Sequence, residues 1–413
     1  MAPNGHVNGV SPPLTIEDLV HSLSRGCKPS SKWGIGTEHE KLGYSKAPPH
    51  ARPTHAQISD MFTRMHESIG WDYIMEGEHK IGLAHGGETV TLEPGGQTEL
   101  SGAPRRDLHA VAAETRAHLA AVRAAGDAAG IDFMAIGLDP RWAFADIPKM
   151  PKTRYRFMRE YMPRVGTLGH DMMFRSCTVQ VNLDFDSEAD MVAKFRVSLA
   201  LQNSWRLHVW TDVDNDRCGR LPWVFDEGFG FRAYVDWVLD VPMYFLYRDG
   251  QYHDVAGQTF RDFFEGRLAG FPGLRPTMDD WELHLTTVFP DVRLKRFLEM
   301  RGADGGDWRF ILALPALWVG LLYDAQALQE SLALTRDWTQ KELDHLQREV
   351  PRLALQTTFR EGTVQDVAKQ ESGETQADVL LRLYETEWDH SIEPLYTPAF
   401  TVDRGLWDDK PSA

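Results

Sequence analysis

The amino-acid sequence predicts an α+β fold, with an antiparallel β-sheet flanked by helices. Strand-like and helix-like segments are interspersed along the 413 residues, without the regular strand–helix–strand alternation of a parallel sheet. Hydrophobic residues make up 42% of the chain and 13 residues are tryptophan, which is typical of a large folded core. We expect a single domain, of the size of an enzyme, over residues 15–400, with a disordered leader at 1–14 and a tail at 401–413.

Helices are predicted where apolar residues recur at intervals of three and four. Thr15 is an N-cap candidate for the first helix, and an alanine-rich helix should span residues 105–129. Ser187 begins a third helix. Residues 362–378 read as a solvated connection before a last helix near 379–388.

The composition excludes several classes of protein. A net charge of −16 disfavours binding to nucleic acid or to an anionic membrane. The most apolar stretch, residues 308–323, is interrupted by Arg309 and Pro315, so it predicts a buried core helix rather than a membrane span. The three cysteines are too few and too scattered for a disulfide framework or a zinc cluster. With neither a secretory signal nor a transit peptide evident before Arg25, we expect a cytoplasmic protein, with a plastid as the alternative in a eukaryote.

Residues 177–185 give the strongest strand pattern. Every odd position is apolar and every even position carries a hydrogen-bonding group, including Gln180 and Asn182. The alternative is an ordinary strand with its polar side in water. The amides and the absence of lysine on that side favour a binding face.

Two further predicted strands carry glutamates. In residues 33–40, Glu38 and Glu40 would share one face, roughly 7 Å apart, with His39 packed neutral on the other. In residues 89–101, a Pro-Gly-Gly bend separates Glu93 from Glu99. Adjacent carboxylates repel unless a cation or a proton lies between them. For residues 33–40 the alternative is an exposed strand whose carboxylates are screened by water, and for residues 89–101 it is a plain hairpin with a solvated edge.

Residues 292–304 mix acid and base. Read as one extended strand, Arg293, Glu299 and Arg301 share a face. Arginines beside an acid suit a site that holds a metal together with phosphate or carboxylate oxygens. A surface strand with salt bridges is the alternative.

Together these strands predict a magnesium site on one face of one sheet. Magnesium prefers oxygen ligands and usually joins protein carboxylates to substrate phosphates. The sequence has no Gly-x-x-x-x-Gly-Lys-Ser/Thr phosphate loop, so a nucleotide would be held by carboxylate-bound metal and arginine.

The same residues resemble the plant and proteobacterial type of glutamate–cysteine ligase. The matching motifs include Gly-Thr-Glu-His-Glu-Lys at 36–41, Leu-Glu-Pro-Gly-Gly-Gln-Thr-Glu-Leu-Ser-Gly-Ala-Pro at 92–104, Met-Pro-Lys-Thr-Arg-Tyr at 150–155 and the run 293–304. The likeness covers nearly all of the chain from about residue 33 to residue 388.

The resemblance implies a glutamine-synthetase-like fold whose concave sheet face binds Mg-ATP and L-glutamate. It also implies a reaction in which ATP phosphorylates the glutamate γ-carboxylate and the L-cysteine amine attacks the acyl phosphate, the first step of glutathione synthesis. Either a monomer or a homodimer would be compatible with it.

Residue roles follow from the same resemblance. Arg293, Arg296 and Arg301 are implied as catalytic, with Arg301 on phosphate. Substrate or ATP would contact Gln97, Arg154, Gln180 and Asn182. The implied metal ligands are Glu38, Glu40, Glu93, Glu99 and Glu299.

The chain departs from relatives in two places, where it is shorter after Gln202 and again after Gly362. A catalytically impaired relative that binds nucleotide or a partner is therefore an alternative to an active enzyme. A ligase with another amine acceptor is a third.

Overall fold

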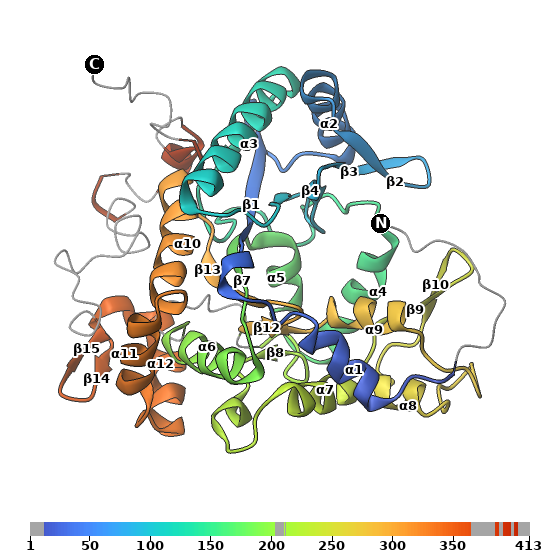
Figure 1. Cartoon of the computed structure of the whole chain (residues 1–413). Helices are drawn as coiled ribbons and strands as arrows, with labels where there is room; N and C mark the ends of the chain where they lie inside the picture. Colours follow the sequence, from blue (N-terminus) through green and yellow to red (C-terminus); the bar gives the residue numbers. More distant parts are fainter. Residues whose placement is uncertain are drawn as a thin grey trace.

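The computed structural model describes residues 12–202, 210, 212–364, 385–387, 391–397 and 400–403. A nine-stranded antiparallel sheet runs through the molecule in the order β12-β13-β7-β1-β5-β4-β3-β2, with β6 beside β1 (Figure 1). This confirms the predicted α+β class. The strands of the sheet are β1 (Ile35–Ser45), β2 (Asp72–Glu76), β3 (His79–His85), β4 (Glu88–Leu92), β5 (Thr98–Ser101), β6 (Ile131–Met134), β7 (Thr178–Leu183), β12 (Val292–Leu294) and β13 (Leu298–Asp304).

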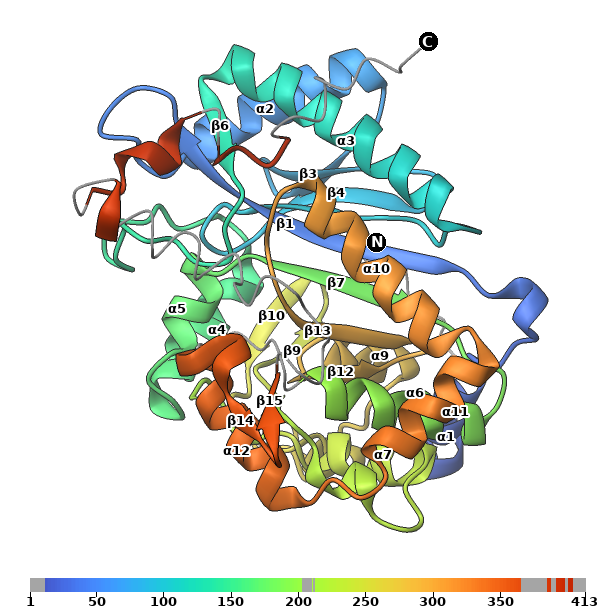
Figure 2. The same ribbon diagram turned by 90° about the vertical axis from the view of Figure 1, so that its left-hand side faces the viewer.

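The helices pack around this sheet, and Figure 2 shows α2, α3 and α10 together on one of its sides. They are α1 (Ile16–Ser24), α2 (His55–Ile69), α3 (Leu108–Ala129), α4 (Thr153–Tyr161), α5 (Gly169–Arg175), α6 (Glu188–Leu201), α7 (Phe231–Asp240), α8 (Phe260–Phe264), α9 (Met278–Leu285), α10 (Trp308–Leu322), α11 (Ala325–Thr335) and α12 (Gln340–Leu353). Smaller strand pairs are β9 (Phe245–Arg248) with β10 (Gln251–Asp254), β8 (Cys218–Gly219) with β11 (Phe289–Pro290), and β14 (Thr358–Phe359) with β15 (Gly362–Thr363).

Side-chain caps fix where the predicted helices begin. Thr15 closes a capping box with Asp18 at the start of α1. Ser187 accepts from the backbone N–H of Asp190 at the start of α6. The alanine-rich helix α3 begins at residue 108 rather than 105, because Asp107 caps it.

The alternation of β7 separates two environments, both inside the protein. Val179, Val181 and Leu183 are at most 1% exposed and pack into the hydrophobic core under the helices. On the opposite side, Thr178 and Gln180 are also buried, each only 4% exposed. Most of the polar side of this strand is therefore buried, with Asn182 only partly exposed, which argues against an ordinary amphipathic strand with its polar side in water.

Helix α10 differs from the expected buried core helix. It buries one stripe, which includes Trp318 and Leu322, but Phe310 is 47% and Leu317 is 42% exposed. The helix lies on the outside of the sheet, so only one side of it meets the core. Within the described residues no single helix is long and apolar enough for a membrane span, although α10 and α11 pass that test as a pair bent by 87°.

Residues 292–304 form a hairpin rather than the single extended strand that we expected. The chain turns at 295–297, and Arg293 pairs directly with Glu299 across β12 and β13. The predicted leader, tail, connection at 362–378 and last helix at 379–388 fall largely outside the described residues.

Candidate active site

Four glutamates line up across neighbouring strands on the polar side of the sheet. Glu38 and Glu40 project from β1, where Glu40 lies opposite Glu99 of β5. Glu93 comes directly after β4, at the turn that leads into β5. Cross-strand pairing therefore gathers these carboxylates, which we call the acidic row: Glu38, Glu40, Glu93 and Glu99.

The acidic row is held by hydrogen bonds from neutral groups. Glu38 accepts from the Asn182 amide at 2.8 Å, and Glu40 accepts from the backbone N–H of Thr178 at 2.7 Å. Glu93 accepts from the Tyr155 hydroxyl at 3.0 Å. No ion pair within 4 Å joins any of the four carboxylates to a lysine or arginine in the part of the chain described.

Their proximity shifts their proton affinities. Burial, followed by the charge of Glu93, raises the pKa of Glu40 to about 8. Burial also raises the pKa of Glu99 well above its ordinary value, with further contributions from Glu93, Glu38 and Glu40. At neutral pH these raised pKa values favour a proton on Glu40 and Glu99, or a cation beside them.

The donor chemistry of the acidic row suits a hard divalent cation, because it offers carboxylate oxygens without competing lysine or arginine partners. The fit is one of charge and ligand type. Across the described residues, no three candidate ligands already stand close enough to share one ion.

A cluster of opposite character lies at the other end of the same face. Glu299 is fully buried. The Arg293 guanidinium donates to both of its carboxylate oxygens, at 3.0 and 2.6 Å, and the Lys295 ammonium lies 3.1 Å from one of them. Arg301 also donates to Glu299. Coulombic attraction to these cations, chiefly Arg293, overcomes burial and holds the pKa of Glu299 well below its usual range. We call Arg293, Lys295, Glu299 and Arg301 the basic cluster.

The amides of β7 join the two groups. Gln180 accepts from Arg301 at 2.6 Å, and Asn182 donates to Glu38. The Asn182 carbonyl oxygen and the Arg301 Nε are buried without a hydrogen-bond partner. Unpartnered buried groups between an acidic and a basic cluster suit a bound polar ligand.

Helix α4 contributes a third group at the acidic end. Lys152, at its N-cap, donates to the Leu92 carbonyl at 2.8 Å and to the Tyr155 hydroxyl at 3.1 Å. The Nε of Arg154 is buried without a partner, which leaves this predicted residue able to take an anion. Lys152, Tyr155 and Lys295 were missed from the predicted site. Lys152 and Tyr155 lie within a motif of the resemblance, at helical spacing.

Two predicted site residues are placed differently from the expectation. Arg296 lies in the β12–β13 turn, where it pairs with Glu282 and its side chain is 48% exposed. Its exposed position and its pairing with Glu282 do not support the expected catalytic role, because the chain turns back there. Gln97 is buried with its amide taken up by backbone groups of α5 and the following loop, so its contacts do not support direct binding of substrate.

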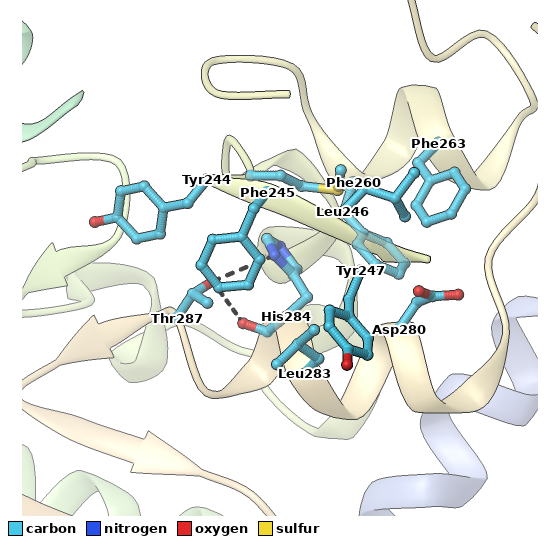
Figure 3. Close-up of a pocket in the computed structure, with 11 residues that line it drawn as sticks. Tyr244, Phe245, Leu246, Tyr247, Phe260, Phe263, Asp280, Leu283, His284 and Thr287 are labelled. Carbon is cyan, nitrogen blue, oxygen red and sulfur yellow. Dashed lines mark hydrogen bonds between the residues drawn. The ribbon is translucent and has the colours of Figure 1, made fainter. Parts of the chain in front are cut away.

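The hollows of the molecule differ in what they could hold. Figure 3 shows one lined by aromatic side chains around His284, away from the acidic row and with only about 10 Å³ of free space. The His284 Nε2 donates to the Val238 carbonyl, and burial lowers the pKa of this imidazole to about 3. A larger pocket of about 550 Å³ lies between the β2–β3 turn and the start of α4. Lys152 lines it and donates to the Tyr155 hydroxyl, which in turn donates to Glu93.

Comparison with known sequences identifies the family. The family model of Glutamate-cysteine ligase family 2 matches residues 34–204 and 203–393. The chain belongs to this family. It is 50% identical to glutamate–cysteine ligase B, chloroplastic, from Oryza sativa subsp. japonica, across 93% of this chain and 87% of that protein. It is 49% identical to the chloroplastic glutamate–cysteine ligase of Nicotiana tabacum, across 93% of this chain and 82% of that protein.

Solved structures are more distant from this ligase. A glutamate–cysteine ligase from Francisella tularensis in complex with AMP gives a TM-score of 0.47 at 11% identity, covering 91% of this chain and 84% of that one.

The expected shortening after Gln202 agrees with the family match. The two matched stretches meet at residues 203–204, directly after Gln202. The alignment with the rice ligase spans 432 positions, more than the 413 residues of the whole chain, so that relative carries residues that this ligase lacks. Residues 203–209 lie outside those described.

Proposed function

We propose that the face carrying the acidic row and the basic cluster is where this glutamate–cysteine ligase performs its reaction. The enzyme joins the L-glutamate γ-carboxylate to the L-cysteine amine at the expense of ATP, through a γ-glutamyl phosphate. One observation supports this location. The acidic row, whose four carboxylates have no lysine or arginine within ion-pair distance, lies on one side of β7, and the basic cluster lies on the other.

The acidic row is proposed to hold magnesium. Bound Mg²⁺ would neutralise phosphate oxygens and polarise the phosphoryl group that is transferred. Glu38, Glu40, Glu93 and Glu99 would hold it. Glu299 is the fifth proposed ligand, and it would have to release one of its cationic partners to bind the ion.

The basic cluster is proposed to serve the anionic reactants. Arg301 has a buried, unpartnered Nε and is already oriented by Gln180, so it would stabilise the charge on the transferring phosphoryl group. Arg293 would act beside it as the second catalytic arginine. In this scheme Arg154 binds a carboxylate or phosphate at the opposite end, and Asn182 orients substrate through its free carbonyl oxygen.

The reaction then depends on positioning two anions and one amine. The glutamate γ-carboxylate oxygen attacks the terminal phosphorus of ATP and ADP leaves. The cysteine amine attacks the acyl carbon, phosphate departs, and the amine loses a proton. Holding both carboxylate and phosphate between fixed cations reduces their repulsion and removes much of the entropic barrier.

The test is release of ADP by the purified chain. We expect ADP and a γ-glutamyl product with Mg-ATP, glutamate and cysteine, and little ADP when cysteine is left out. ATP binding without turnover would refute the proposal and favour an impaired relative. Faster ligation with another amine than with cysteine would reassign the acceptor.

We also propose a cytoplasmic location, for which the three free cysteines give support because thiols persist in reducing compartments. The rice and tobacco relatives are named as chloroplastic. Imaging of a fluorescent fusion would distinguish cytoplasm from plastid, and sedimentation would distinguish a monomer from a homodimer.

A further inference from the structure

The turn between β4 and β5 connects two members of the acidic row, Glu93 and Glu99. It begins after Glu93 and enters β5 one residue before Glu99, and it is closed by a hydrogen bond from the Gly96 N–H to the Glu93 carbonyl at 2.8 Å. Gly96 has a φ of +79°, a conformation that L side chains rarely adopt. A Cβ on Gly95 would collide with the Phe174 carbonyl, so the turn lies directly against α5.

Arg52 holds this turn from behind. Its side chain is 1% exposed, and it donates to the Gly95 carbonyl at 2.8 Å and to the Phe174 carbonyl at 3.3 Å. The same guanidinium pairs with Asp139 at 2.9 Å, a carboxylate that is equally buried. One side chain therefore ties together the β4–β5 turn, the end of α5 and the loop that follows β6.

Gln97 makes a second connection between the same parts. Its amide nitrogen donates to the carbonyls of Met173 and Ser176, at 3.2 and 2.8 Å. Its amide oxygen accepts from the Gly95 N–H at 3.0 Å. Both ends of the side chain are thus used to hold the turn against α5.

Such a clamp has a physical purpose here. The four carboxylates of the acidic row repel one another. Glu93 is the one member that lies outside a strand, at the start of the β4–β5 turn, so strand pairing does not hold it. Without a fixed turn, Glu93 could move apart from Glu38, Glu40 and Glu99, which the strands hold, until repulsion was relieved. A metal would then have to pull them together again, at the expense of its affinity.

We propose that Arg52 and Gln97 are positioning residues that preorganise the acidic row for a divalent cation. This inference rests on the proposed metal site. It assigns to Gln97 a role in holding the turn, in place of the expected contact with substrate.

The test compares Arg52→Met and Gln97→Met with Arg248→Met. Arg248 is a matched control because it also forms a two-pronged ion pair, with Asp280, but on β9 and α9, apart from the acidic row. The probe is Mn²⁺ alone, without nucleotide or amino acid. Its dissociation constant is measured by electron paramagnetic resonance of free Mn²⁺, and the rise in Tm caused by Mg²⁺ is measured in parallel.

We expect Arg52→Met to weaken Mn²⁺ binding about 10- to 100-fold, a loss typical of residues that orient metal ligands, and to lessen the Mg²⁺-induced rise in Tm. Gln97→Met should have an effect in the same direction, whereas Arg248→Met should bind Mn²⁺ as the wild type does. If Arg52→Met fails to fold, Arg52→Lys and Gln97→Met carry the comparison, and Arg52→Lys is expected to lie between wild type and Gln97→Met.

Two outcomes would overturn the inference, and they are distinguishable. A wild-type protein that binds no Mn²⁺ would refute the proposed metal site itself. Wild-type binding with unchanged affinity in the folded Arg52 and Gln97 variants, or with equal weakening in Arg248→Met, would refute only the positioning role.

Discussion

Replacing Glu40 by glutamine should make the metal-free protein more resistant to alkaline pH. The carboxyl of Glu40 has its pKa raised from 4.5 to about 8 by burial and by Glu93. A group whose pKa is raised on folding contributes stability that is complete below the unfolded value and is lost as pH rises through the folded value. The metal-free wild type should therefore lose stability between about pH 4.5 and pH 8, and Glu40→Gln should remove that part of the loss.

The size of the effect follows from the shift. At about 1.4 kcal/mol per pKa unit, a rise from 4.5 to about 8 corresponds to a ceiling of about 5 kcal/mol. Glu40 is only partly buried and its neighbours share the proton, so we expect about 2 kcal/mol between pH 5.5 and pH 8.5. Mg²⁺ should restore the wild type at pH 8.5, because a bound cation replaces the proton, and it should stabilise Glu40→Gln less.

Urea unfolding in the presence of a chelator, at several pH values between those limits, measures this directly. The matched control is Glu282→Gln, a surface carboxylate that is 50% exposed and paired with Arg296. Parallel pH profiles for wild type and Glu40→Gln would show that folding does not raise the pKa of Glu40. Equal stabilisation of both proteins by Mg²⁺ would show that the Glu40 carboxylate does not help to bind the cation.

Three further outcomes are expected. Arg301→Met should lower kcat on the order of 10²- to 10³-fold in the ADP-release assay, because it removes a donor to the transferring phosphoryl group. Replacing the exposed Arg296 by alanine should leave kcat unchanged, and equal losses in the two variants would contradict the placement of Arg296 in the hairpin turn. Trp318→Ala should lower the free energy of unfolding by about 3 to 5 kcal/mol, since this side chain is 1% exposed, and a loss below about 1 kcal/mol would place it outside the core. Thr54→Ala should cost about 1 kcal/mol in urea unfolding by removing the capping box of α2, with Thr54→Ser close to wild type as its control.

Predictions that depended on residues close together in the chain agree well with the structure. The starts of α1 and α6 follow from caps that bond within three residues. The alternation at 177–185 placed Gln180 and Asn182 on one side of a strand, because successive side chains point to opposite faces. The pairing of Glu38 with Glu40 on one face followed from the same rule.

Predictions that needed the path of the chain were less successful. Residues 292–304 carry no glycine or proline at 295–297, so the sequence gives little sign of the hairpin that places Arg296 in an exposed turn. Helix α10 is apolar on nearly all sides, and only its neighbours decide that Phe310 stays exposed. Arg52 lies outside every motif, and no local pattern indicates that it will be buried against Asp139.

The sequence by itself therefore determined that the segments around Glu38, Glu99 and Gln180 are strands, which of their side chains share a face, and to which family the chain belongs. These properties rest on backbone geometry within a few residues and on motifs carried intact. Only the tertiary structure decided that Glu40 lies opposite Glu99, that Glu299 is surrounded by cations, and that Arg52 holds the β4–β5 turn. Those contacts join residues far apart in the chain, so strand register and helix packing had to be settled before any of them could exist.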